Sequence, residues 1–69
     1  MIIKSTADIG NLVKKLRKEK KLTQVELAQL SNIGVRFISD LENGKPTCEI
    51  GKILKVVANL GIKIEANNG

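Results

Sequence analysis

The stretch "TQVELAQLSNIGVRFISDLENGKPT", Thr23 to Thr47, carries two apolar periodicities with only "SNIG" between them. Two helices joined by so few residues must turn sharply and cross at a large angle. The crossing needs a small side chain, which Ala28 provides. The turn needs a positive φ, which Asn32 tolerates better than other non-glycine residues. We therefore expect two short helices packed around one tight crossing.

The first of these helices has a clear signal at its start. Thr23 and Glu26 have the spacing of a capping box, in which each side chain accepts a backbone N–H that the helix would leave free. We expect the helix to stop near Ser31. Its inward side should consist of Leu27, Ala28 and Leu30.

The second helix should open at Gly34 or Val35. Ile38 and Leu41 are its firmest core positions, because they keep the helical spacing. The letters "ENGKP" end it, since Gly44 readily adopts the left-handed conformation found just after a helix and the proline cannot continue one.

Two further helices should flank this pair. The first covers about residues 7–19, where Ser5 or Thr6 can cap a segment with apolar residues at i, i+3, i+4 and i+7. The second should follow a cap at Thr47 and run to Leu60. Its helical repeat consists of Ile50, Ile53, Leu54 and Val57.

The period changes after the last helix. Residues 62–65, "IKIE", alternate apolar and charged side chains, as a half-buried strand does. The apolar "MII" at the start of the chain is also too short for a helix. A lone strand leaves backbone groups unpaired, so these two segments need partners, either each other or another chain.

The composition fits one small domain over residues 1–69 with a polyanion as partner. The net charge is +5 and the pI is near 9.7, which favours nucleic acid first and an anionic membrane second. No apolar run approaches a spanning helix or a signal peptide. A core this small gives marginal stability, so a partner subunit is plausible.

The chemistry-bearing residue types are few. Cys48 is the only cysteine and histidine is absent, which rules out an intrachain disulfide and the usual zinc sites and suggests a reducing, cytoplasmic setting. Phe37 is the only aromatic residue, against single-strand binders that stack bases. We expect no enzyme activity, no cofactor and no metal.

The outward face of the second short helix suits the reading of base edges in a major groove. Arg36 can bind guanine O6 and N7 bidentately, worth about 1–3 kcal/mol of discrimination, or can pair with Asp40 one turn later. Asp40 can accept from cytosine N4 or, as we prefer, orient Arg36. Val35 suits a thymine methyl, and Ser39 suits a base or a phosphate.

The sequence "LTQVELAQLSNIGVRFISDLENGKPT" resembles the helix-turn-helix of the Cro and phage-repressor superfamily, the XRE type. More narrowly, "RFISDLENGKPT", followed by a helix and "LGIKIE", is similar to HipB-like antitoxins. The resemblance implies an all-α, lambda-repressor-like domain of four to five short helices with a core of about residues 7–60. It also implies a short C-terminal β-strand, residues 62–65, that pairs across a dimer through Ile62 and Ile64.

The resemblance assigns roles to several polar residues. Gln24 would contact a phosphate and support the start of the second short helix, while Arg17 and Glu42 would form a structural ion pair. Gly34 replaces the usual serine or threonine, with loss of a side-chain cap. Phe37 stays undecided between packing on the last helix and DNA backbone contact. The full set of expected phosphate-binding residues is Thr23, Gln24, Gly34, Asn43, Lys45 and Thr47.

The function implied is a dimeric, nucleoid-associated repressor that binds a palindromic double-stranded operator. As a HipB-like antitoxin of a type II toxin–antitoxin module, it would also bind and neutralise a HipA-type kinase toxin and regulate its own operon. We expect no small-molecule effector, because few residues follow Leu60. The alternatives are a free-standing Cro-like repressor and a protein-binding subunit that does not read DNA sequence.

Overall fold

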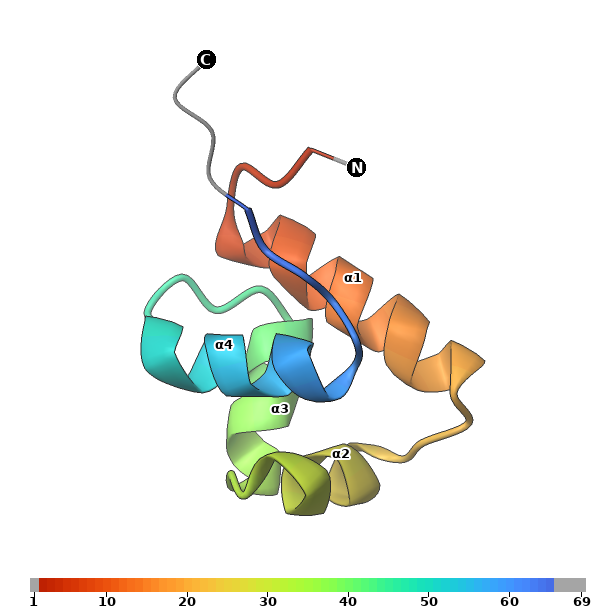
Figure 1. The fold of residues 1–69 in the computed structure, drawn as a ribbon. Coiled ribbons are helices and arrows are strands. Elements are labelled where there is room, and N and C mark those ends of the chain that lie inside the picture. Colours follow the sequence, from red (N-terminus) through yellow and green to blue (C-terminus); the bar gives the residue numbers. More distant parts are fainter. Residues whose placement is uncertain (1, 66–69) are drawn as a thin grey trace.

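The computed structural model describes residues 2–65, which contain four helices and no strand. Their bounds are α1 Thr6–Glu19, α2 Gln24–Ser31, α3 Val35–Glu42 and α4 Ile50–Asn59. In Figure 1, α1 crosses the upper part of the molecule, α2 and α3 form the lower part, and α4 lies across the front. The fold is all-α, as the sequence predicts.

All four helices contribute to one core. Its most deeply buried side chains come from α1, α2, α3 and α4 alike, so no helix packs against a separate cluster. This shared core fixes the crossing of α2 and α3. Its buried apolar residues are Val13, Leu27, Ala28, Ile38, Leu41, Ile53, Val56, Val57 and Leu60.

Most helix ends are where the sequence places them. Ser5 is the N-cap of α1, and its hydroxyl oxygen accepts the Asp8 backbone N–H at 3.2 Å. Gly44 follows α3 with a φ of +78°, as predicted for the residue that ends this helix. After α1, a residue the sequence did not single out, Lys21, has a φ of +58°.

The start of α4 corrects one prediction. Thr47 does not cap this helix: Glu49 is the N-cap, and its side chain makes no capping hydrogen bond. The reason is a turn that precedes the helix, closed by the Cys48 N–H donating to the Lys45 carbonyl oxygen at 3.3 Å. This turn delays the helix until Ile50.

Three apolar residues differ from the pattern. Leu30, predicted to face inward, is 57% exposed, because it lies on the side of α2 away from α3 and α4. In α4, Ile53 and Val57 are buried as the repeat suggests, but Ile50 and Leu54 are 62% and 46% exposed. The buried residues of α4 and its C-cap are Ile53, Val56, Val57 and Leu60, so the inward stripe is shifted around the helix from the predicted one.

Gly10 permits a close approach of α1 to the end of α3. A Cβ added at Gly10 would lie 2.0 Å from the Leu41 carbonyl oxygen, a distance that no real Cβ contact allows. Any side chain here would push the two helices apart. The sequence pattern gave no sign of this role.

The C-terminal segment, residues 62–65, follows α4 and runs back across α1 (Figure 1). Ile62 is partly buried against the core, and its N–H donates to the Val57 carbonyl oxygen at 3.0 Å. The segment is not a strand in the single chain. Its pairing across a dimer needs a second copy and stays a prediction.

Candidate nucleic-acid interface

The crossing of α2 and α3 has the predicted geometry. Asn32 adopts the left-handed conformation, with φ 54° and ψ 47°. The next N–H, that of Ile33, donates to the Ala28 carbonyl oxygen at 3.0 Å. Ala28 itself is buried, so the two helices approach over its small side chain. The prediction for Ala28 and Asn32 is confirmed.

The candidate base-reading residues lie on the side of α3 away from the core. Ile38 and Leu41 are fully buried, whereas Val35 and Arg36 are exposed and Ser39 and Asp40 are half-buried. Val35 also lines a shallow hollow between α2 and α3, together with Gln29 and Asn32. The sequence analysis did not predict that Gln29 lies at this surface. The available signal was its spacing of four residues from Val25, on the exposed side of α2.

Asp40 does not orient Arg36, which corrects our preferred interpretation. Its carboxylate oxygen Oδ2 lies 3.6 Å from Lys45 Nζ, and this is the ion pair that the structure shows for Asp40. Within residues 2–65, Arg36 forms no ion pair. Lys45 therefore screens the negative charge on α3, while the guanidinium of Arg36 extends into solvent.

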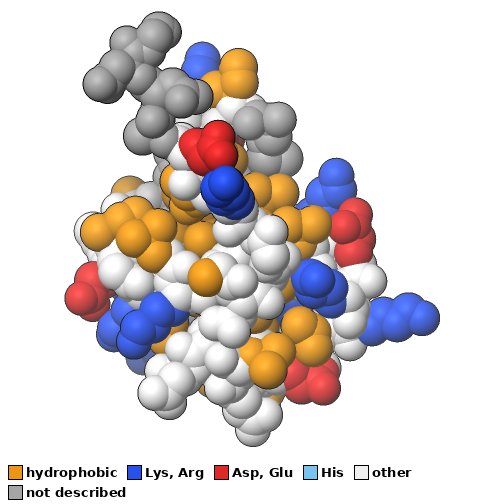
Figure 2. Space-filling view, in the orientation of Figure 1, with side chains coloured by type: hydrophobic (Ala, Val, Ile, Leu, Met, Phe, Trp, Pro, Cys, Tyr) orange, Lys and Arg blue, Asp and Glu red, His pale blue; other side chains and the backbone are white. Residues whose placement is uncertain are grey.

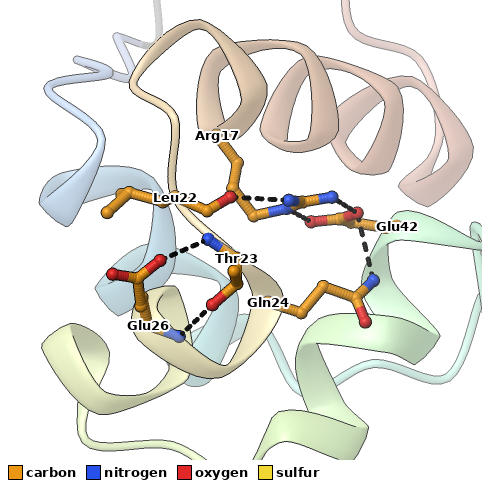
Figure 3. Close-up of polar contacts among 6 residues, drawn as sticks. All are labelled: Arg17, Leu22, Thr23, Gln24, Glu26 and Glu42. Carbon is orange, nitrogen blue, oxygen red and sulfur yellow. Dashed lines mark hydrogen bonds and ion pairs between the residues drawn. The ribbon is translucent and has the colours of Figure 1, made fainter.

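A buried ion pair ties α1 to the end of α3 (Figure 3). Arg17 Nε donates to Glu42 Oε2 at 2.6 Å, and Nη2 donates to Oε1 at 2.9 Å. The third donor, Nη1, reaches the Leu22 carbonyl oxygen at 2.8 Å. Hydrogen bonding to Glu42 raises the pKa of Arg17, against the opposing effect of burial. The expected structural pair is confirmed.

Gln24 joins this network, but not where we expected. Its Nε2 donates to Glu42 Oε1 at 3.2 Å, so it supports the last residue of α3 and not the first (Figure 3). The reason is the crossing angle, which brings the start of α2 beside the end of α3. The half-buried side chain still reaches the surface.

Thr23 and Glu26 form the predicted capping box. The Thr23 hydroxyl oxygen accepts from the Glu26 N–H at 3.0 Å, and a Glu26 carboxylate oxygen accepts from the Thr23 N–H at 2.8 Å (Figure 3). The Thr23 hydroxyl keeps its own hydrogen for another acceptor. Gly34, at the start of α3, makes no side-chain cap, as expected.

The loop between α3 and α4 exposes most of its predicted phosphate contacts. Asn43, Lys45 and Thr47 are all exposed. The start of α4 is less favourable to an anion than the sequence suggests, because the Glu49 carboxylate stands there, paired with Lys52 at 3.7 Å. Phosphate binding in this loop would therefore depend on Lys45 more than on the helix end.

Phe37 packs against the core, which is one of the two roles expected for it. It is partly buried, and Lys52 Nζ of α4 lies 5.7 Å from the ring centroid. Cys48, in the same neighbourhood, is partly buried, and desolvation raises the pKa of its thiol, with a further upward effect from Asp40. A raised pKa disfavours the reactive thiolate.

Two other kinds of functional feature were sought in the described part of the chain: a membrane-spanning helix and a metal-binding cluster. None of its helices is long and apolar enough to cross a membrane. Residues 2–65 hold no cluster of three or more histidine, cysteine or acidic side chains that could bind a metal. The exposed face of α3 and its flanking loops are thus the best-developed candidate site.

Comparisons with known proteins identify a family and several similar proteins. The family model described as Helix-turn-helix matches residues 13–67. The HTH-type transcriptional regulator y4mF of Sinorhizobium fredii is 56% identical over 63 residues, covering 91% of this chain and 83% of that protein. The immunity repressor protein of Bacillus phage phi105 is 34% identical over 84% of this chain, which spans 40% of that repressor. A solved HipB–O1–O2 complex has a TM-score of 0.87 at 25% identity, over 99% of both chains.

Proposed function

This chain belongs to the helix-turn-helix family of DNA-binding transcription regulators, and we propose that it is a sequence-specific repressor of the HipB-like antitoxin type. The observation that carries the proposal is the structural match to HipB, with a TM-score of 0.87 over 99% of the chain. The HipB neighbours are solved as complexes, one with O1 and O2 and one with an O2 20mer.

In the proposed complex, α3 enters the major groove. Arg36 is the principal base reader, because it is exposed and unpaired within the described residues and can bind guanine bidentately. Val35 and Ser39 would contact neighbouring bases. Asp40, held by Lys45, would serve mainly to exclude bases that present only acceptors to it. The proposed phosphate contacts are Thr23, Gln24, Gly34, Asn43, Lys45 and Thr47.

One such domain reads only a few base pairs, so we propose a two-fold dimer on a palindromic operator. Two copies of α3 would lie about 34–36 Å apart, in successive major grooves. Linking two weak readers raises affinity through effective concentration. The C-terminal segments, with Ile62 and Ile64, would join the copies.

The regulatory partner in this proposal is a HipA-type kinase toxin, which the dimer would bind and neutralise while repressing its own operon. HipB resemblance in both sequence pattern and fold supports this assignment. A kinase-like reading frame beside the gene is the expected companion. Its product should co-purify with this chain and lose activity on binding it.

The decisive experiment measures binding to an operator from the gene's own promoter. Arg36→Ala should weaken operator binding about 10- to 100-fold and change random-sequence binding much less, since a base contact is worth about 1–3 kcal/mol. Lys18→Ala, an exposed cation on α1, is the matched control and should lower both affinities slightly. Equal losses at the two DNAs would contradict base reading by Arg36.

A free-standing phage-type repressor is the second candidate, favoured by the likeness to the phage phi105 immunity repressor. The two functions differ in the partner. Operator binding without a neighbouring kinase gene would favour the free repressor. Toxin binding with no preference between operator and random DNA would favour the third possibility, a protein-binding subunit.

A further inference from the structure

The turn after α1 holds a lysine in a backbone conformation that disfavours it. Lys21 has a φ of +58°, in the left-handed region, where the Cβ of an L-residue comes too close to the following carbonyl oxygen. The other described residues with a positive φ are Asn32, Gly44 and Gly61, which are types that tolerate this region. Lys21 is thus the strained residue among the four, and backbone strain concentrates at functional positions.

The turn is held in this conformation by its hydrogen bonds. The Lys21 N–H donates to the Lys18 carbonyl oxygen and the Leu22 N–H donates to the Arg17 carbonyl oxygen, both at 3.0 Å, which is the pattern of a Schellman motif. The Leu22 carbonyl oxygen in turn accepts from Arg17 Nη1 at 2.8 Å. Because the buried Arg17 fixes the turn, Lys21 cannot leave the left-handed region, and a glycine would fit there with less strain.

The side chain of Lys21 has no partner that would offset this strain inside the protein. Lys20 and Lys21 are both exposed, and neither forms an ion pair with any residue from 2 to 65. A cation is favourable at the end of a helix, but Lys18 in the last turn and Lys20 at the C-cap already supply one. A contact outside the chain would account for a lysine at position 21.

The turn lies directly before the start of α2, where a phosphate contact is already proposed. Two peptide units separate Lys21 from Thr23, so their Cα atoms are at most about 7.6 Å apart. Charges follow one another every ~3.4 Å along the axis for each DNA strand. The long side chain of Lys21 can therefore reach a phosphate beside the one at Thr23. Figure 2 shows basic side chains on the side of the molecule where Figure 1 places the end of α1.

We propose that the Lys20–Lys21 turn is a further DNA-binding site, which holds a backbone phosphate next to the one bound at the start of α2. The proposal rests on the DNA-binding function proposed above and adds a contact that lies outside α3 and the loop after it. The ammonium group is a compact charge that binds phosphate without a fixed geometry, and a phosphate contact carries no base preference. Lys21 is the principal contact and Lys20 strengthens the local positive potential.

The charges around the turn favour an anion more than those in the loop after α3. In that loop, Lys45 has the Asp40 carboxylate 3.6 Å away, so part of its charge is already balanced. Residues 18–21 hold three lysines and one glutamate, which leaves a net charge of +2. The backbone of the turn is also fixed before DNA arrives, so binding costs only the freedom of the side chains.

The first test is Lys21→Gly, which should change stability and DNA binding in opposite directions. Relief of the left-handed strain should raise Tm by about 4 °C, measured at equal protein concentration. Loss of the phosphate contact should weaken binding to operator and to random-sequence DNA by the same factor, roughly threefold for each copy of the chain bound. A more stable protein that binds less tightly cannot be explained by damage to the fold.

The second test separates charge from backbone. Lys21→Asn removes the charge but tolerates the left-handed region, so it should bind DNA as Lys21→Gly does. Lys21→Arg keeps both the charge and the strain, and should bind as the wild type does. Lys55→Ala, which removes an exposed cation from α4, is the control and should leave binding nearly unchanged. For Lys21→Gly, the slope of log Kobs against log salt should become shallower by about 0.9 for each copy bound.

The third test locates the phosphate. Ethylation of single phosphates in the operator should interfere with wild-type binding at one position beside the contact of the start of α2. Binding by Lys21→Gly should no longer respond to ethylation at that position, while the other sites of interference remain.

These outcomes decide the proposal. Wild-type affinity and salt slope in both Lys21→Gly and Lys21→Asn would overturn the site, and a turn that binds an acidic protein instead of DNA would give this result. An equal loss in Lys21→Arg would show that charge is not the cause. A lower Tm in Lys21→Gly would overturn the argument from strain. A shallower slope in Lys21→Gly, with no preference of the wild type for operator DNA, would support the phosphate site and count against the repressor function.

Discussion

The helix-turn-helix part of the molecule and the part formed by α4 with the segments beside it differ in the contacts that hold them. In the first, a buried ion pair with three ordered donors, a capping box and a glycine contact join α1, α2 and α3. In the second, α4 has no side-chain cap, and its outer apolar residues face solvent.

The difference separates polar contacts that are complete within one chain from apolar side chains that the chain leaves exposed. The polar groups of Arg17, Glu42 and Gln24 are matched to one another inside a single chain, so this part should keep its geometry without help. By contrast, Ile50 and Leu54 of α4 are 62% and 46% exposed in the single chain.

Breaking the buried ion pair should have the largest effect. Glu42→Ala leaves the buried Arg17 charge without its partner, and we expect a loss of about 3–5 kcal/mol in the free energy of unfolding. Urea denaturation measures it. Asp40→Ala, which removes the exposed pair with Lys45, is the control and should cost less than about 1 kcal/mol. Similar losses in both variants would show that the two pairs do not differ.

Gly10→Ala should come next. The added Cβ would overlap the Leu41 carbonyl oxygen, and backbone cannot move aside cheaply, so we expect a loss of about 3 kcal/mol, the upper end of the usual range for overpacking. In the other part of the molecule, Gly51→Ala meets no atom within 4 Å and lies in a helix, so it should gain up to about 1 kcal/mol. A neutral Gly10→Ala would mean that α1 and α3 are not held in close contact.

Ser31→Ala should improve the helix-turn-helix part. The Ser31 hydroxyl oxygen is buried and has no hydrogen-bond partner, the one such side-chain atom found within residues 2–65. Removing it relieves an unsatisfied polar group and adds a better helix former, so thermal unfolding should show a gain of about 1 kcal/mol. A loss of stability would indicate that the hydroxyl is bonded in solution, for example to water.

Gly34→Ser should have the smallest effect on stability. Gly34 is the N-cap of α3 with a φ of −65° that serine adopts freely, and no atom lies near an added Cβ. A serine cap improves on glycine by a few tenths of a kcal/mol. The same change should tighten binding to DNA of any sequence by adding a phosphate contact; weaker binding would place this end of α3 away from the backbone.

Much of the first part was predictable because its signals are local or fall within one recognised pattern. The capping box of Thr23 and Glu26, the left-handed Asn32 and the turn at Gly44 each follow from residue chemistry over a few positions. The Arg17–Glu42 pair came from resemblance to the family, because nothing local links residues 25 apart. The roles of Arg36 and its neighbours on DNA remain predictions.

Hydrophobic period, capping and charge act over short distances or without regard to fold, so the helices, the crossing and the basic character of the chain follow from the residues alone. Three findings needed the packed structure: Gly10 faces a carbonyl group, Asp40 pairs with Lys45, and the side chains of Leu30, Ile50 and Leu54 face outward. Each of these depends on how helices lie against one another. An apolar stripe predicts that one face of a helix will be buried. Whether other helices of the same chain bury that face depends on how they pack.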